Sequence, residues 1–93
     1  MIRTFRNREP ERIFDGQRST LIPGHLLPAA QRKLIQIDAA TAVEDLREPP
    51  SNHLKVLSGD RAGQWSIRIN QQYRICFRWE DGNAYDVEVT DYH

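Results

Sequence analysis

Arginines 68 and 74, together with the C-terminal Tyr92 and His93, are the residues of this 93-residue sequence whose types suit chemistry on a phosphate. Two guanidinium groups can hold and neutralise a phosphorus centre on which negative charge develops. Histidine exchanges a proton near neutral pH, and tyrosine can stack on a base or hydrogen-bond a ribose hydroxyl. These are the parts needed to cut RNA, because RNA supplies its own nucleophile, the 2′-hydroxyl.

The strand pattern brings the two arginines together. Apolar residues are odd-numbered in both 65–69 and 73–79, and a three-residue loop at 70–72 buries both sets on one face of a hairpin. The same register sets Arg68 opposite Arg74 on the polar face, where two like charges cost roughly a few tenths of a kcal/mol in solvent. A phosphate bound between them would offset that cost, although for surface arginines in general the commoner arrangement is two side chains that extend separately into water.

The next hairpin extends this polar face. A two-residue turn at Asp81-Gly82 would set Phe77 opposite Asp86 and bury the carboxylate, so a three-residue loop, Asp81-Gly82-Asn83, is favoured. The predicted pairs are Trp79–Tyr85, Phe77–Val87 and Ile75–Val89 on the apolar face, and Arg78–Asp86 and Arg74–Thr90 on the polar face. Tyr92 and His93 would then lie beside Arg74, unless the terminal Asp91-Tyr92-His93 is a frayed tail.

Helical segments that must support this sheet precede it in the chain. A helix is predicted over Glu9–Asp15, with Pro10 near its first turn and Gly16 just past its end. The main amphipathic helix is predicted over His25–Ala40, where apolar residues recur at helical spacing. Thr41 to Glu44 has the pattern of a capping box, which would open a short turn that ends at Pro49-Pro50.

Strand patterns follow the helices. The predicted strands are a short first strand at Ile2–Phe5 and four later ones at Leu54–Leu57, Trp65–Ile69, Tyr73–Trp79 and Tyr85–Thr90. Helices that come first and strands that follow indicate an α+β fold with an antiparallel sheet covered on one face. A chain of this length favours a single domain over residues 1–93.

Composition narrows the class of protein. The sequence lacks an apolar run of the roughly 18 residues that a membrane span needs, and its start lacks the apolar stretch of a signal peptide. The single cysteine, Cys76, cannot form an internal disulfide, so a soluble cytoplasmic protein is expected. The three histidines and Cys76 lack metal-ligand spacing, and we expect neither a metal nor a cofactor.

Arginine dominates the cations of a chain whose formal net charge is zero. All but two of the 13 cations, Lys33 and Lys55, are arginines. The planar guanidinium fork suits phosphate, but a GC-rich genome explains the same composition equally well. The neutral net charge itself gives no argument for nucleic acid.

A family resemblance rests on three segments of the sequence. Residues 57–70, LSGDRAGQWSIRIN, with 72–77, QYRICF, and the terminal DYH resemble the HigB toxins of the RelE superfamily; MIRTF at 1–5 and IDAAT at 37–41 are also similar. The resemblance implies a RelE-like fold, in which an N-terminal strand and two to three helices pack on one face of a twisted antiparallel sheet. It also implies the toxin of a type II toxin-antitoxin system, which cleaves mRNA in the ribosomal A site without a metal. The implied partners are the 70S ribosome with its mRNA and a HigA-like helix-turn-helix antitoxin.

Matching the family's motifs residue by residue assigns a site. The two arginines of the family's hairpin fall on Arg68 and Arg74, and its terminal acid, tyrosine and histidine fall on Asp91, Tyr92 and His93. Further RNA contacts are expected from Lys55, Arg61 and Arg78, although Arg61 could instead be a solvated residue of the turn between Gly59 and Gly63. Many members carry a histidine and a lysine where this sequence has Lys55 and Ser58, so the general base is left unassigned.

Two other classes of function remain open at this point. One is a superfamily member that poisons by binding, as ParE-like proteins do to DNA gyrase. The other is an RNA- or ribosome-binding module without catalysis, to which the neutral net charge is an objection. The set of Arg68, Arg74 and His93 favours cleavage over the first of these classes.

Overall fold

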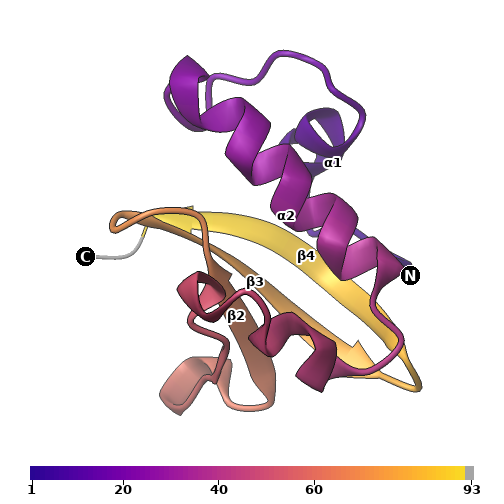
Figure 1. Cartoon of the computed structure of the whole chain (residues 1–93). Helices are drawn as coiled ribbons and strands as arrows, with labels where there is room; N and C mark the ends of the chain where they lie inside the picture. The colour runs from indigo at the N-terminus through magenta and orange to yellow at the C-terminus, as the bar shows by residue number, and fades with distance from the viewer. Residues whose placement is uncertain (92–93) are drawn as a thin grey trace.

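A computed structural model describes residues 1–91 and places two α-helices on one face of an antiparallel sheet (Figure 1). Within these residues the sheet has four strands in the order β1-β2-β3-β4. The main elements are α1 (Arg8–Phe14), α2 (Leu27–Ala39), β1 (Lys55–Val56), β2 (Gln64–Arg68), β3 (Tyr73–Glu80) and β4 (Asn83–Asp91). The predicted α+β fold is therefore confirmed. None of the helices in this described part is long and apolar enough to cross a membrane.

Short 3-10 segments lie in three of the connections: between the two α-helices, between α2 and β1, and between β1 and β2. They are η1 (Gly24–Leu26), η2 (Val43–Arg47), η3 (Pro50–Asn52) and η4 (Gly59–Arg61). A capping interaction is present at the start of η2, but the prediction named the wrong acidic residue for it. Asp45, not Glu44, accepts hydrogen bonds from the backbone N–H groups of Thr41 and Ala42, both at 3.1 Å. These bonds hold the pKa of the Asp45 carboxyl below its usual value.

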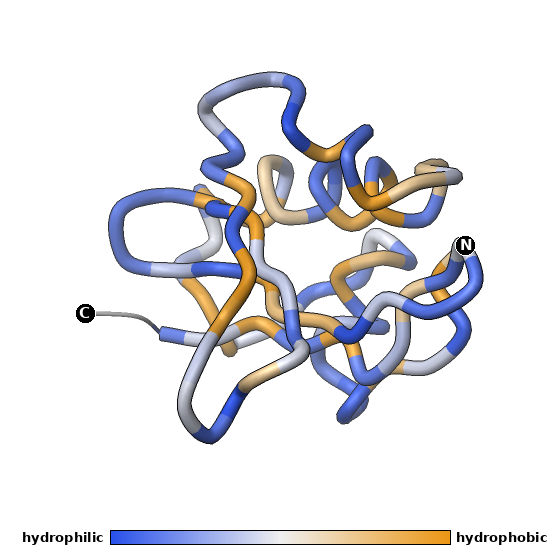
Figure 2. The backbone as a smooth tube through the Cα atoms, turned by 90° about the horizontal axis from the view of Figure 1, so that it is seen from below, coloured by the Kyte–Doolittle hydropathy of each residue, from blue (hydrophilic) through white to orange (hydrophobic). Residues whose placement is uncertain are grey.

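The core lies between the odd-numbered face of the sheet and the helices. Ile67, Ile75 and Phe77 are fully buried there against Leu34 and Ile37 of α2. Figure 2 shows hydrophobic stretches running through the middle of the molecule, while most outer loops are hydrophilic. Apolar residues at every second position of the strands form one side of this core, and apolar residues at helical spacing in α2 form the other.

The β3–β4 hairpin differs from its predicted register near the turn. Its loop has two residues, since Glu80 pairs with Asn83, and both Asp81 (φ 52°) and Gly82 (φ 77°) adopt the left-handed backbone of the turn type favoured by Asp-Gly. The pair predicted between Trp79 and Tyr85 is therefore wrong, because Trp79 pairs with Ala84.

A β-bulge restores the predicted register further along this hairpin. One residue of β3, Phe77, faces two residues of β4, Asp86 and Val87, and Asp86 has φ 53°. The bulge keeps the carboxylate out of the core, which was the reason for rejecting the two-residue turn. Beyond it, Ile75 pairs with Val89 as predicted.

The predicted N-terminal strand is present only as two isolated parallel bridges along the outer edge of β4. Ile2 bridges Ala84 and Phe5 bridges Val87. Between them, the N–H of Asp86 donates to the side-chain oxygen of Thr4 at 2.8 Å instead of to the backbone. The bulge in β4 thus interrupts the ladder, so a regular first strand was the wrong prediction.

Asn52 anchors the segment that leads from α2 into the sheet. Its side chain is fully buried and donates to the carbonyls of Leu46 (3.1 Å) and Glu48 (3.2 Å), while Lys33 of α2 donates to its oxygen. Burial lowers the pKa of Lys33. The network therefore ties η2 and η3 to the main helix.

Replacing Asn52 with alanine should lower the free energy of unfolding by about 2 kcal/mol, because the carbonyls of Leu46 and Glu48 and the ammonium group of Lys33 each lose a hydrogen bond. Urea denaturation followed by circular dichroism would measure the change. The exposed neighbour Ser51 offers a control, and its replacement by alanine should change stability by less than ~0.5 kcal/mol. Equal effects of the two substitutions would show that Asn52 does not anchor the segment.

Candidate functional site

The even-numbered face of the sheet gathers the polar residues of the candidate site. Arg68 pairs directly with Arg74, as predicted, and Arg74 pairs on its other side with Thr90. The next row along the strands contains Lys55, Ser66, Cys76 and Glu88. Directly paired residues point to the same side of a sheet, so Lys55 lies on the same face as the two arginines.

Arg74 is buried and held in one orientation. Only 6% of it is exposed. Its Nε donates to the hydroxyl of Ser66 at 2.9 Å, and its Nη2 donates to the carbonyl of His53 at 2.7 Å. Two bonds from different atoms fix the plane of a guanidinium, which is the condition for a group that must meet developing charge without rearranging. Arg68 is half-buried, and none of the hydrogen bonds or ion pairs described within residues 1–91 involves its side chain.

His53 contributes its backbone and not its imidazole to this arrangement. His53 directly follows η3, and its backbone is left-handed (φ 46°, ψ 52°). The residue is exposed to solvent. This conformation costs about 1 kcal/mol or more in a residue other than glycine. Here it accompanies the turn that directs the carbonyl oxygen toward Arg74. The sequence analysis did not identify this contact.

Arg61 reaches the same face from η4. Its Nη2 lies 2.7 Å from the Glu88 carboxylate, and its Nη1 donates to Gln64 at 3.1 Å. Its side chain is 31% exposed, so the picture of a solvated turn residue is wrong. The other predicted RNA-binding residue near this row, Lys55, is exposed at the edge of the sheet.

Arg78 is engaged at the other end of the face. Its Nε lies 2.9 Å from Asp86 and its Nη1 lies 3.5 Å from Glu80, while its guanidinium stacks on the ring of Tyr85 at 5.3 Å. The predicted charge pair between Arg78 and Asp86 is thus present, but the predicted strand pairing is wrong, because Arg78 pairs with Tyr85 ahead of the bulge. The two carboxylates raise the pKa of Arg78 further above its usual value. Arg78 is four residues from Arg74 along β3, which is ~13 Å in an extended strand.

The terminal residues of the predicted site are only partly described. Asp91 pairs with Tyr73, one position beyond the row of Arg74, and its carboxylate accepts a hydrogen bond from Gln72 at 3.1 Å. Because paired residues point to the same side of a sheet, Asp91 lies on the same face as Tyr73, which is opposite to the face of Arg68 and Arg74. Tyr92 and His93, for which catalytic roles were predicted, lie outside the described residues.

Cys76 sits at the centre of the face but is unsuited to nucleophilic chemistry. It is fully buried, and burial raises the pKa of its thiol. Since the thiolate is the reactive form, the thiol is expected to stay protonated. No group of three or more histidine, cysteine, aspartate or glutamate side chains able to hold a metal occurs within residues 1–91.

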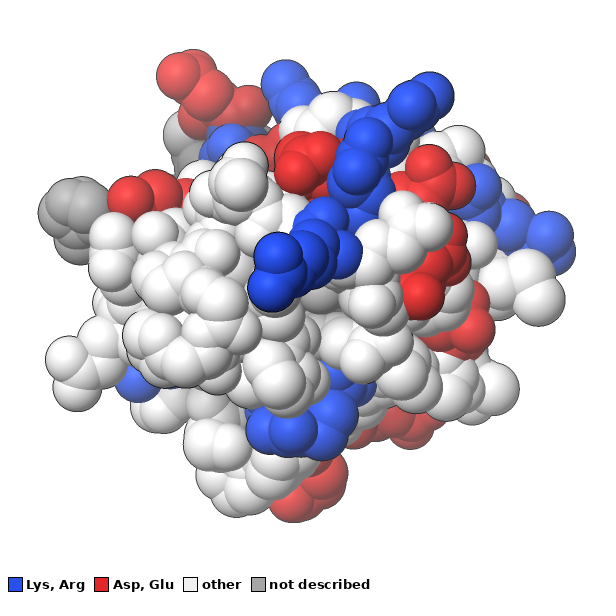
Figure 3. Space-filling view, turned by 90° about the horizontal axis from the view of Figure 1, so that it is seen from above, with Lys and Arg blue, Asp and Glu red and all other residues white. Residues whose placement is uncertain are grey.

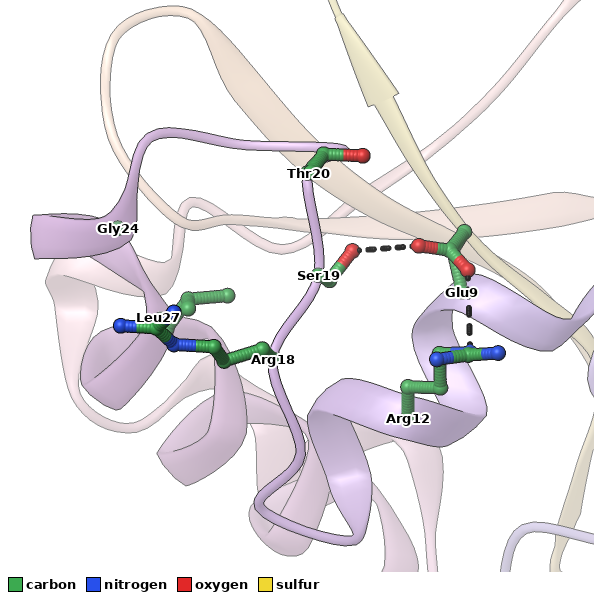
Figure 4. A pocket seen from close by; sticks show the side chains of 7 residues that line it. All are labelled: Glu9, Arg12, Arg18, Ser19, Thr20, Gly24 and Leu27. Atoms are coloured by element: carbon green, nitrogen blue, oxygen red, sulfur yellow. Dashed lines mark hydrogen bonds and ion pairs between the residues drawn. The ribbon is translucent and has the colours of Figure 1, made fainter.

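A separate hollow of about 360 Å³ lies on the helical side of the molecule (Figure 4). Its lining comes from α1, the following loop and the start of α2: Glu9, Arg12, Arg18, Ser19, Thr20, Gly24 and Leu27. Glu9 already accepts from Ser19 at 2.9 Å and pairs with Arg12 at 3.3 Å. On the face seen from above in Figure 3, basic and acidic side chains are intermixed. We therefore place the candidate site on the sheet and not at this hollow.

Three side chains of the site were missed by the sequence reasoning. Ser66 and Glu88 are even-numbered members of the same alternation that identified Arg68 and Arg74, so that pattern could have found them. Arg6 pairs with Glu88 at 2.9 Å across the edge of β4. Nothing in the local sequence around Arg6 points to this contact, because the two residues are far apart in the chain.

Comparison with known proteins gives a consistent set of relatives. Residues 3–93 match the family described as RelE-like toxin of type II toxin-antitoxin system HigB. Toxin HigB-1 of Vibrio cholerae serotype O1 is 44% identical over 81 residues, which are 86% of this chain and 85% of the relative. Endoribonuclease HigB of Proteus vulgaris is 31% identical over 93 residues, the whole of both chains.

Solved structures show the same fold at lower identity. The YoeB-YefM complex from Staphylococcus aureus contains a chain that is 15% identical, with a TM-score of 0.62 over all of this chain and 98% of that one. A YoeB/ParE toxin from Agrobacterium tumefaciens is also 15% identical, with a TM-score of 0.56 over 99% of this chain and 100% of that one. At these identities the likeness concerns the fold, and it agrees with the predicted RelE-like architecture.

Proposed function

We propose that this chain, which belongs to the HigB family of RelE-like toxins of type II toxin-antitoxin systems, acts by cutting mRNA on the ribosome. The observation that carries the proposal is the directly paired Arg68 and Arg74 on the polar face, with Arg74 held by Ser66 and by the carbonyl of His53. A like-charged pair of this kind is explained by an anion between the two side chains. The name of the Proteus vulgaris relative, an endoribonuclease, supports RNA as that anion.

The proposed reaction needs no metal. The 2′-oxygen of the nucleotide before the cut attacks phosphorus and loses its proton to a base, and the bond from phosphorus to the 5′-oxygen breaks, which leaves a cyclic phosphate and a 5′-hydroxyl. Arg74 stabilises the charge of the phosphorane, and Arg68 shares this role with positioning of the phosphate. His93 gives its proton to the leaving 5′-oxygen, and Tyr92 stacks on a base or hydrogen-bonds the 2′-hydroxyl.

Asp91 and Arg78 have less support as parts of this machinery. Asp91 is assigned to the other side of β4, and Arg78 is already paired with two carboxylates. Lys55 and Arg61 lie on the same face of the sheet as Arg68 and Arg74, and we assign them to binding the RNA backbone. The general base stays unassigned, since this sequence has Lys55 where many relatives carry histidine.

The proposed partners are the translating 70S ribosome, in the cytoplasm, and an antitoxin. One similar solved structure is a toxin-antitoxin complex by its title, RelBE2 from Mycobacterium tuberculosis, and another is the YoeB-YefM complex from Staphylococcus aureus. We expect a HigA-like antitoxin with a helix-turn-helix domain, encoded beside this chain, to form a stable complex with it. Growth arrest on expression of this chain should then be relieved when that neighbouring protein is expressed with it.

In vitro translation with primer-extension mapping of the message tests the proposal. The purified chain should produce defined cuts at codons in the ribosomal A site, and it should leave the same message uncut when ribosomes are omitted. If the message remains intact on stalled ribosomes, the chain inhibits translation by binding and does not cleave RNA. Undisturbed translation together with inhibited DNA supercoiling would instead identify a gyrase poison.

A further inference from the structure

Glu88 is a buried carboxylate that joins two arginines from distant segments. Its side chain is 10% exposed, with Arg6 Nε at 2.9 Å from one oxygen and Arg61 Nη2 at 2.7 Å from the other. The hydroxyl of Thr90 donates to the oxygen shared with Arg61 at 3.0 Å. Both oxygens of the carboxylate are thereby engaged, and both guanidinium groups are directed onto the sheet.

This group of three carries a surplus of positive charge. One carboxylate cannot neutralise two guanidinium groups, so Arg6, Glu88 and Arg61 together have a formal charge of +1. The side chains of Arg6 and Arg61 are 59% and 31% exposed, whereas the side chain of Glu88 is 10% exposed. A salt bridge that served stability alone would need only one arginine, and buried ion pairs are weak contributors to stability.

The group lies one row from the proposed cleavage site. Glu88 pairs with Cys76, which is two residues from Arg74 on β3 and on the same face. Two residues of extended strand span ~7 Å, a length comparable with the repeat of a nucleotide chain. A strand whose scissile phosphate lay between Arg68 and Arg74 could therefore place a neighbouring phosphate near Arg6 and Arg61.

We propose that Arg6 and Arg61 bind a second phosphate of the mRNA, adjacent to the scissile one, and that Glu88 is the positioning residue that holds both arginines for it. This inference rests on the proposed function. It adds to that function a defined contact to the backbone beside the cut. Arginine forks provide charge and paired donors to phosphate oxygens, while a sequence-independent contact of this kind sets affinity and register but not base preference.

Binding to ribosomes programmed with a message that has a 2′-deoxynucleotide at the cut site separates this contact from cleavage. Arg61→Ala should weaken binding about tenfold and reduce the slope of log affinity against log salt by about 0.7, the value for one phosphate contact on a single strand. Arg12→Ala is the matched control, because Arg12 is an arginine of similar exposure paired with Glu9 on α1. It should leave both quantities unchanged.

Messages with an uncharged methylphosphonate at either phosphate next to the cut identify the contact. One of the two should weaken wild-type binding about as much as Arg61→Ala does, and it should cause little further loss in the Arg61→Ala protein. The proposal would be overturned if, for the methylphosphonate at each of the two phosphates, the loss of binding free energy simply added to the loss caused by Arg61→Ala. An Arg61→Ala protein that binds as tightly as the wild type would also overturn it.

Glu88→Gln tests the positioning role by the sign of its effect. If Glu88 only opposes the charge of the RNA, its neutralisation should tighten binding; if it positions the arginines, binding should weaken severalfold, and Glu88→Asp should recover part of the loss. Tighter or unchanged binding would overturn the role of Glu88. If the wild-type protein binds the programmed ribosome but never cuts the message, the proposed cleavage is refuted. The binding measurements would still show whether Arg6 and Arg61 bind a second phosphate.

Discussion

Replacement of Arg74 by alanine should reduce the single-turnover rate of mRNA cleavage about a hundredfold, or ~3 kcal/mol of transition-state stabilisation. The reason is that Ser66 and the carbonyl of His53 hold this guanidinium in place before charge develops on the phosphate. Binding to the programmed ribosome should change much less. Rapid-quench measurement at saturating enzyme would separate the two quantities, and Arg12→Ala serves as the control.

Because Arg74 is buried, a loss of folding must be separated from a loss of chemistry. Arg74→Lys keeps the charge but not the planar fork, so it should fold and should lose about tenfold in rate. Thermal melting of both variants would check the fold. A folded Arg74→Ala protein that cuts within threefold of the wild-type rate would remove Arg74 from the catalytic machinery.

Removal of His93 should slow cleavage about a hundredfold on an ordinary message, because the leaving 5′-oxygen then lacks a general acid. A message with a 5′-phosphorothiolate at the cut has a sulfur leaving group that departs without a proton. On that message the same variant should lose only a few fold. Single-turnover assays of both messages would give the comparison.

Arg74→Ala is the natural contrast for this experiment. Its defect concerns the charge on the phosphorane, which develops whichever atom leaves, so it should be slow on both messages. Equal losses of the His93 variant on the two messages would refute its role as acid and would leave His93 as a binding or stacking residue.

The register of the β2–β3 hairpin was predictable because it depends on neighbours in the chain. The alternation of 65–69 and 73–79 and the length of the loop between them require Arg68 opposite Arg74, and the structure has this pair. The β3–β4 hairpin was only half predictable. Asp86 avoids the core through a left-handed backbone and a bulge, and a hydrophobic pattern contains no information on either.

The sequence by itself determined the fold class, the apolar core face and the pair of arginines, since each follows from a local period of two or 3.6 residues. Only the tertiary structure decided what surrounds the pair. The polar face was expected to be open, yet Ser66, Arg74 and Glu88 are buried in it. Arg6 and Arg61, which lie 82 and 27 positions from Glu88, meet there because folding brings the edge of β4 and η4 together. Such contacts depend on three-dimensional packing, which no local pattern of residues encodes.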